Sequence, residues 1–193
     1  MIRASLFLGH CDNPSLKTKY ATIWLHIFSK SALICSTLNL THEQVARMQD
    51  KIQREIMIKA TKERIYEAIA NPEKVVLWFP ETLEGSYKVG EQLIFGFGEH
   101  GKNQVYVEAA RPHEYFAYRW VPGCNHFLGD VLAVPNTLVE FHIETQADNI
   151  CKLTLTETGF SKLPAELIEK SVAQNSNGWE FMLGRLEKYF AEV

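Results

Sequence analysis

The sequence predicts an α+β domain over residues 48–193, with a curved, mostly antiparallel sheet of about six to seven strands wrapped around a long C-terminal helix. Three observations support this prediction. Segments that alternate polar and apolar residues follow one another up to residue 158, which is typical of half-buried strands. Short connections join them, which favours antiparallel neighbours. After residue 159 the apolar spacing changes to three and four residues, as in an amphipathic helix.

The first strand is expected at residues 51–60, where isoleucines alternate with polar side chains. Thr61 is a suitable N-cap for a short helix over residues 62–70. A second short helix is expected from Pro72 to the residue before Pro80, because proline favours the first turn of a helix and disrupts its interior.

The middle of the chain is expected to form the rest of the sheet. Turns are indicated at Gly90, at the glycine-centred loop 99–103 and at residues 111–114 and 146–149, with a longer loop over 122–135. The strands between them are expected at residues 86–91, 93–97, 104–110, 115–121, 137–145 and 150–158.

The C-terminal helix is expected to begin near residue 164, with an interruption around residues 175–178. It must lay its apolar stripe on the covered face of the sheet, because nothing else in the chain is long enough to cover that face. The stripe consists of Trp179, Met182, Leu183, Leu186 and Phe190.

Charge is unevenly distributed along the chain. Residues 1–47 hold five of the 20 Lys and Arg residues and two of the 23 Asp and Glu residues, which leaves a net charge of −6 on residues 48–193. Nucleic acid and anionic membranes would repel such an acidic domain. We therefore expect no nucleic-acid partner.

Residues 1–47 show neither strand nor helix periodicity, and we expect an irregular N-terminal extension there. His26 and Lys30 interrupt its apolar run, so no membrane insertion is expected. The late start of that run and the lack of a clear cleavage site argue against a signal peptide. Because Met48 directly precedes the first strand pattern, we hypothesise that translation starts there and that residues 1–47 are not part of the native protein. An intact mass of all 193 residues from the native host would contradict this.

No motif for catalysis or metal binding is recognisable. The four cysteines include no C-x-x-C pair, the histidines lack ligand spacing, and Gly-x-Ser-x-Gly is absent. We therefore expect no catalytic residue, no metal and no other cofactor. Free thiols are typical of a reducing, cytoplasmic location.

Motifs in a fixed order make the chain similar to a known superfamily. They are Trp78-Phe79-Pro80, Gly90, Val105 with Glu108 and Pro112, Tyr118, Trp120, Leu153 to Glu157 with Gly159-Phe160, and Gly178-Trp179 with Leu183 and Leu186. The chain resembles the START-like (SRPBCC) superfamily and, within it, the family named after the C-terminal domain of the activator of the heat-shock-protein-90 ATPase. The resemblance spans residues 51–190 and implies the helix-grip fold and a link to the stress response.

Two charged residues fall at positions that alternate in step with the apolar residues of their strands, so their side chains should point to the covered face. They are Arg54 in the first strand and Glu157 in the last. The resemblance makes these strands antiparallel neighbours. Because an unpaired charge on a covered face is costly, we expect Arg54 to pair with Glu157. The pair would either close one end of the core as a salt bridge or serve as a polar anchor in a ligand cavity.

A set of large apolar side chains falls on the expected inner face. It either fills the core or leaves a cavity for an apolar guest, and in the second case these side chains, with Arg54 and Glu157, are the candidate ligand-binding residues. Trp78-Phe79-Pro80 would form a lip at the cavity mouth or anchor the short helices. The set comprises Trp78, Phe95, Phe97, Phe116, Tyr118, Trp120, Phe141, Trp179 and Leu183.

Three functions remain open at this point. The first is a non-enzymatic domain that binds a small hydrophobic molecule between sheet and helix. The second, implied by the resemblance, is a co-chaperone that contacts a heat-shock chaperone ATPase; residues 1–47 are too short to be the extra N-terminal domain of the named activator. The third is a cyclase or hydrolase acting in the cavity, as in some members of the superfamily.

Overall fold

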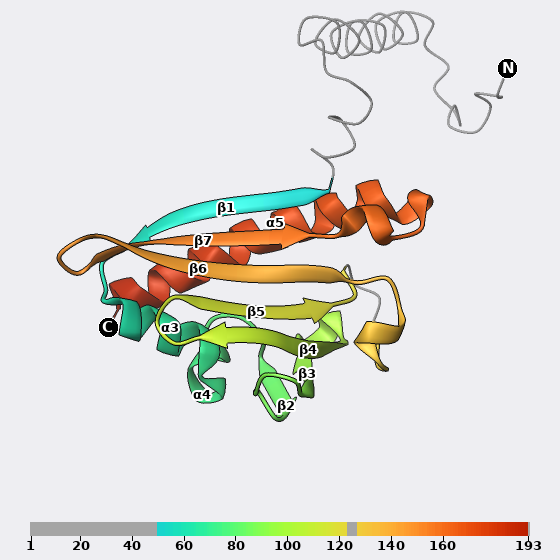
Figure 1. Ribbon diagram of the computed structural model, residues 1–193, viewed down its shortest axis with the longest axis horizontal. Coiled ribbons are helices and arrows are strands. Elements are labelled where there is room, and N and C mark those ends of the chain that lie inside the picture. Colours follow the sequence, from blue (N-terminus) through green and yellow to red (C-terminus); the bar gives the residue numbers. More distant parts are fainter. Residues whose placement is uncertain (1–49, 123–126, 193) are drawn as a thin grey trace, which may run out of the picture. The chain divides into compact units, whose positions relative to one another are not determined.

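The computed structural model describes residues 50–122 and 127–192, which form one sheet and the helices that cover it (Figure 1). The predicted helix-grip architecture is confirmed. The strands are β1 (Lys51–Ile58), β2 (Thr82–Gly85), β3 (Gln92–Gly96), β4 (Lys102–Arg111), β5 (Tyr115–Trp120), β6 (Thr137–Ala147) and β7 (Ile150–Thr158). The helices are α3 (Lys62–Ala70), α4 (Pro72–Val75) and α5 (Ala165–Ala191), with 3-10 turns η1 (Gly98–His100), η2 (Val131–Ala133) and η3 (Phe160–Lys162).

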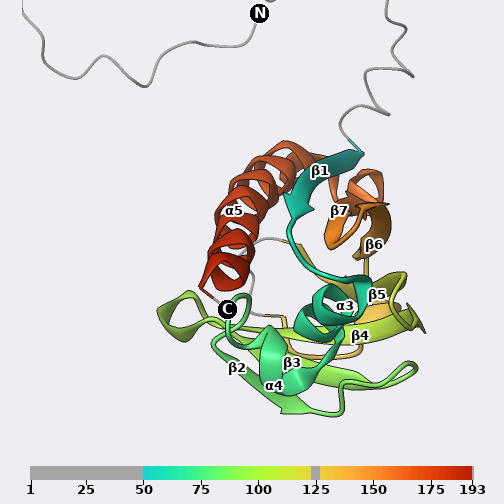
Figure 2. The same ribbon diagram turned by 90° about the vertical axis from the view of Figure 1, so that its left-hand side faces the viewer.

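The seven strands form one antiparallel sheet in the order β1-β7-β6-β5-β4-β3-β2. The sheet curves, and α5 and α3 lie on its concave side (Figure 2). The alternation in β6 sets this face, since Thr137, Val139, Phe141 and Ile143 are all buried. The hypothesis that translation starts at Met48 concerns residues 1–47, which lie outside the described residues, and it stays a prediction.

Helix α5 buries Trp179, Leu183 and Leu186 of the predicted stripe, leaves Met182 and Phe190 half-buried, and extends the stripe toward the N-terminus. Its buried residues follow a spacing of three or four and add two polar members to the expected apolar ones. The expected interruption at residues 175–178 is wrong, because α5 continues through them. The Asn175 side chain bonds inward instead of competing for the helix backbone, so it does not end the helix. The buried residues are Ser171, Asn175, Trp179, Leu183 and Leu186.

The strand expected at residues 86–91 is wrong. The structure has β2 at Thr82–Gly85, where Leu83 pairs with Phe95 of β3, and the following residues form the turn into β3. Tyr87 explains the misleading pattern. Its ring packs against Phe95 and Phe116 and its hydroxyl donates to the Ile69 carbonyl at 3.1 Å, so it points inward as a strand residue would.

The second short helix ends earlier than expected. Helix α4 stops at Val75 instead of continuing to residue 79. A turn follows, in which the backbone N–H groups of Trp78 and Phe79 both donate to the Val75 carbonyl, at 3.3 and 3.0 Å. Both aromatic side chains are buried as a result.

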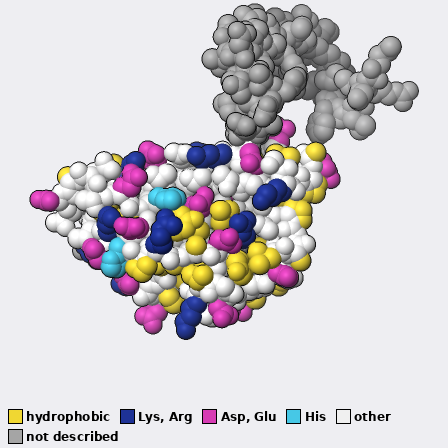
Figure 3. Space-filling view, in the orientation of Figure 1, with side chains coloured by type: hydrophobic (Ala, Val, Ile, Leu, Met, Phe, Trp, Pro, Cys, Tyr) yellow, Lys and Arg dark blue, Asp and Glu magenta, His cyan; other side chains and the backbone are white. Residues whose placement is uncertain are grey.

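The surface in Figure 3 carries basic and acidic side chains interspersed with scattered hydrophobic ones. Ion pairs at the protein surface include Lys102 with Glu84 at 2.6 Å and Lys152 with Glu144 at 2.8 Å. Cys151 is a buried free thiol, as expected of a small hydrophobic residue in a strand. Within the described residues no helix combines the length and the apolar character needed to span a membrane.

Candidate binding pocket

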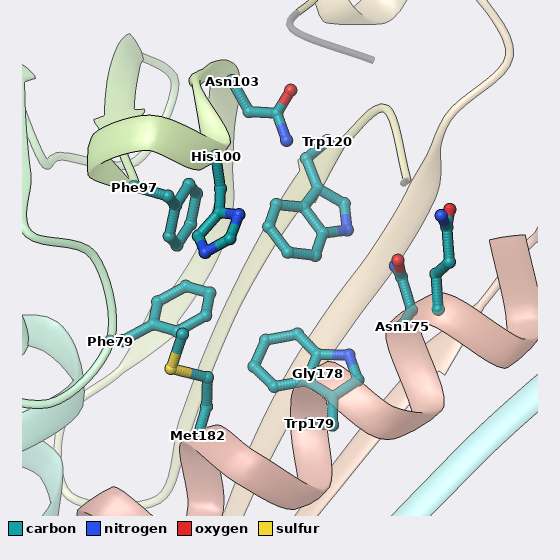
Figure 4. A pocket seen from close by; sticks show the side chains of 10 residues that line it. Phe79, Phe97, His100, Asn103, Trp120, Asn175, Gly178, Trp179 and Met182 are labelled. Carbon is teal, nitrogen blue, oxygen red and sulfur yellow. The ribbon is translucent and has the colours of Figure 1, made fainter. Parts of the chain in front are cut away.

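A pocket of about 170 Å³ opens between the middle of α5 and the sheet (Figure 4). Aromatic rings and a thioether make up most of its wall, and polar side chains from η1, β4 and α5 complete it. The lining residues are Phe79, Phe97, His100, Asn103, Trp120, Gln174, Asn175, Gly178, Trp179 and Met182.

Several elements deliver these side chains. From α5, Asn175, Gly178, Trp179 and Met182 point the same way because they are three, four and seven residues apart. The residue after β3, Phe97, and the last residue of β5, Trp120, face them from the sheet.

Phe79 lies at the centre of the aromatic wall. Its ring stacks on Trp179 with centroids 5.1 Å apart and planes at 20°. It also meets Phe97 edge-on at 5.5 Å and lies 6.0 Å from Trp120. Such offset and edge-to-face contacts are the preferred geometries of aromatic pairs. The four rings therefore form one rigid surface facing the pocket.

A buried carboxylate lies behind two of these rings. Glu157 is fully buried and accepts hydrogen bonds from Trp120 Nε1 at 2.8 Å, Thr137 Oγ1 at 2.6 Å and Trp179 Nε1 at 2.6 Å. Asn175 Nδ2 donates to both carboxylate oxygens, at 2.8 and 3.0 Å. Four side chains from three elements thus converge on one carboxyl group.

The donors match an ionised carboxylate. Indole and amide N–H groups can only donate, so both Glu157 oxygens must act as acceptors. Burial raises the pKa of Glu157 above its usual value of 4.5, because a low-dielectric surrounding disfavours the charged form. The hydrogen bonds from Thr137, Trp120, Trp179 and Asn175 act in the opposite direction on this pKa.

The expected pairing of Arg54 with Glu157 is wrong. Both side chains point inward as the alternation of residues predicted, but Glu157 lies opposite Ile52 in the sheet register and Arg54 lies opposite Leu155. The Arg54 guanidinium donates to Ser176 Oγ at 2.5 Å and to the Gln53 carbonyl at 3.0 Å. The carboxylate of Glu157 accepts hydrogen bonds from neutral side chains instead. These donors lie on other elements, so the alternation of residues within one strand could not predict them.

Three of the expected aromatic residues line the pocket, namely Phe97, Trp120 and Trp179. The other large apolar candidates are buried beside it, and we call them the closed core. They are Trp78, Phe95, Phe116, Tyr118, Phe141 and Leu183, each exposed by at most 3%. One part of the predicted aromatic set therefore faces the pocket, and the other part is packed inside the core.

Other lining residues were not among the candidate site residues, although Met182 belongs to the predicted stripe of the C-terminal helix. Asn175 and Met182 lie four before and three after Trp179, so the helical period that identified the stripe also identifies them. Two roles were proposed for the Trp78-Phe79-Pro80 motif, a lip at the cavity mouth or an anchor for the short helices, and the adjacent residues Trp78 and Phe79 lie in different places. Trp78 anchors the short helices through its Nε1 bond to the Ala68 carbonyl at 2.8 Å, while Phe79 faces the pocket.

Within residues 50–122 and 127–192 no cluster of three or more His, Cys, Asp or Glu side chains is arranged to hold a metal ion. The carboxyl group of Glu157 is enclosed by its donors, so it presents no accessible general base to a molecule in the pocket.

Comparison with protein families places this fold in a known group. The family model described as activator of Hsp90 ATPase homolog 1-like protein matches residues 59–191. The chain belongs to this family. The matched residues include both the pocket wall and Glu157. The comparison with curated protein sequences gave no match.

Solved structures share the fold. A putative protein of the dynemicin biosynthetic locus is 25% identical with a TM-score of 0.58; the match covers 72% of this chain and 46% of that protein, less than half its length. The Aha1 dimer from Colwellia psychrerythraea is 19% identical with a TM-score of 0.56, covering 72% of this chain and 95% of that one. An Hsp90 activator from Plasmodium falciparum is 15% identical with a TM-score of 0.56, covering 74% and 96%.

Proposed function

We propose that this domain binds a small, largely apolar molecule in the pocket between α5 and the sheet, without transforming it. The observation that carries the proposal is the pocket of about 170 Å³ walled by Phe79, Phe97, Trp120 and Trp179. Concave, mostly apolar sites with a few placed polar groups are the usual form of ligand pockets.

The volume limits the size of the guest. An apolar cavity of about 150 Å³ admits a molecule the size of benzene. A pocket of about 170 Å³ therefore suits one ring or a compact branched group, or one end of a longer molecule. His100 and Asn103 at its sheet side are placed to contact a polar substituent of such a guest.

Two glycines of α5 provide a matched test. A Cβ built on Gly178 or on Gly184 meets no atom within 4 Å, so both positions accept a side chain, but only Gly178 is a lining residue. In Gly178→Leu the new side chain competes with the guest for the pocket. Gly184→Leu adds the same group to the same helix elsewhere.

The measurement is native mass spectrometry of the full chain purified from its host. A bound small molecule is expected on the wild type and on Gly184→Leu, and a loss of it on Gly178→Leu. Equal retention by both variants would contradict the pocket as the binding site, and wild-type protein free of any small molecule would argue against the function.

Family membership favours a second candidate, a partner role toward a heat-shock chaperone ATPase. The likeness to the Plasmodium falciparum Hsp90 activator supports it. We expect the chain to raise the ATPase rate of its host's Hsp90-type chaperone if it has this role, and an unchanged rate would remove the candidate. A cytoplasmic location and a role in the stress response stay predictions that accompany this candidate.

A further inference from the structure

Within residues 50–122 and 127–192, no cationic side chain bonds to the carboxylate of Glu157. Its hydrogen-bond partners are Thr137, Asn175 and two tryptophans, which are all neutral. Arg54, the charged residue on the neighbouring strand, is held by Ser176 instead. Buried charges in proteins are normally paired, so a carboxylate satisfied only by neutral donors leaves a net negative potential around it.

Two indoles connect this carboxylate to the pocket. Trp120 and Trp179 donate to Glu157 through their nitrogen edges, and their rings line the pocket. Figure 4 shows both nitrogens turned toward the side of Asn175. A hydrogen bond to an anion polarises the donor, which makes the indole faces more electron-rich. Electron-rich indole is the aromatic group that attracts cations most strongly.

The rest of the wall favours the same kind of guest. Phe79 and Phe97 add two further rings, and the Met182 thioether adds a polarisable surface. Among the lining residues that the structure describes there is no lysine or arginine, so no fixed positive charge opposes a cation there. Aromatic boxes of this kind are the usual receptors for quaternary ammonium groups.

We propose that the guest of this pocket is a free small organic cation with an apolar surface, of the quaternary ammonium class. This inference rests on the proposed binding function and specifies the chemistry of its ligand. The trimethylammonium group suits a pocket of about 170 Å³ that an apolar ring would also fit. The four rings supply contact area, and the carboxylate behind two of them supplies the preference for positive charge.

The experiment compares choline with its neutral isostere, in which a tert-butyl group replaces trimethylammonium. The two molecules have nearly the same shape, so the difference in their affinities isolates the charge. Isothermal titration calorimetry of the full chain should give choline an affinity about tenfold or more above that of the isostere. Equal or tighter binding of the isostere would overturn the cation preference while leaving the proposed function intact. Absence of binding by both would overturn both proposals.

Two variants locate the source of the preference. Glu157→Gln keeps the side-chain shape and removes the charge, so the choline preference should fall to about twofold or less while the isostere binds as before. Phe97→Leu serves if that variant does not fold, because Phe97 is only half-buried and carries no charge. It should weaken choline more than the isostere. A loss that is equal for both molecules in either variant would contradict the proposal.

Discussion

The pocket and the closed core are built from the same kinds of side chain, yet only one of them is open. In the closed core, rings such as Phe95 and Tyr118 meet other buried rings on several sides, at centroid distances near 5.7 Å. In the pocket, Trp120 and Trp179 are fixed by their nitrogen edges to Glu157. Rings held in this way cannot turn to fill the space between them. The same kinds of aromatic side chain therefore line an open pocket in one place and fill a closed core in another, so aromatic content alone does not decide which of the two forms.

The largest effect is expected from removing the carboxylate that fixes the pocket wall. Glu157→Ala leaves the donors of Trp120, Thr137, Asn175 and Trp179 without their acceptor in a buried site. The free energy of unfolding, measured by urea denaturation, should fall by about 3–5 kcal/mol. Glu144→Ala is the control, since that exposed carboxylate pairs only with Lys152 and its loss should change stability little. Equal effects of the two substitutions would contradict this account.

Two phenylalanines on the same face compare the closed core with the pocket directly. Phe95 is fully buried, whereas Phe97, two residues later, is half-buried at the pocket. Phe95→Ala creates a cavity in packed surroundings and should cost about 3–5 kcal/mol of stability. Phe97→Ala enlarges a space that is already open and should cost about 1 kcal/mol. Similar losses in thermal or urea unfolding would mean that the pocket wall is packed as tightly as the core.

The pH dependence of stability reports on the buried carboxyl. Since burial raises the pKa of Glu157 in the folded protein above 4.5, the folded state binds this proton more tightly than the unfolded state. Its contribution to stability is fully present below pH 4.5 and is lost as pH rises through the folded pKa. Urea unfolding from about pH 5 to about pH 8 should show this decline in the wild type and a flatter profile in Glu157→Gln. A profile that is identical in both proteins would contradict the raised pKa.

The smallest effect is expected from the helix glycines. Gly178→Ala and Gly184→Ala each place a methyl group where no atom lies within 4 Å. Both should raise the free energy of unfolding by about 0.5–1 kcal/mol, because alanine loses less backbone entropy in a helix. The gain should be equal at the two positions, since neither methyl group is large enough to fill the pocket. A loss of stability in either variant would show that its surroundings are closed.

Periodicity predicted most of the fold, because each strand and α5 carries its apolar face in its own sequence. The alternation within the strands predicted that Arg54 and Glu157 point inward, and the helical spacing predicted the buried face around Trp179. The strand predicted at residues 86–91 was wrong because Tyr87 points inward from a turn, where its ring packs on Phe95 and Phe116 and its hydroxyl bonds to Ile69. A side-chain contact between segments that are distant in the chain produces no regular spacing of residues, so the sequence pattern does not predict it.

The site was less predictable for the same reason. Neighbouring strands were expected to pair Arg54 with Glu157, but the donors of Glu157 come from β5, β6 and α5, whose convergence depends on sheet curvature. The division between Trp78 in the core and Phe79 at the pocket depends on where α4 ends. Asn175 and Met182 could have been found, because they lie four residues before and three residues after Trp179 on the same face of α5.

According to the proposed function, the pocket and not the closed core receives the ligand. Indole N–H resonances of Trp120, Trp179 and Trp78 test it most directly, because two of these tryptophans line the pocket and the third donates to Ala68 inside the core. In a ¹H–¹⁵N titration of the full chain with choline, the Trp120 and Trp179 signals should shift together and saturate while Trp78 stays in place. Unchanged Trp120 and Trp179 signals, or an equal shift of Trp78, would contradict the account.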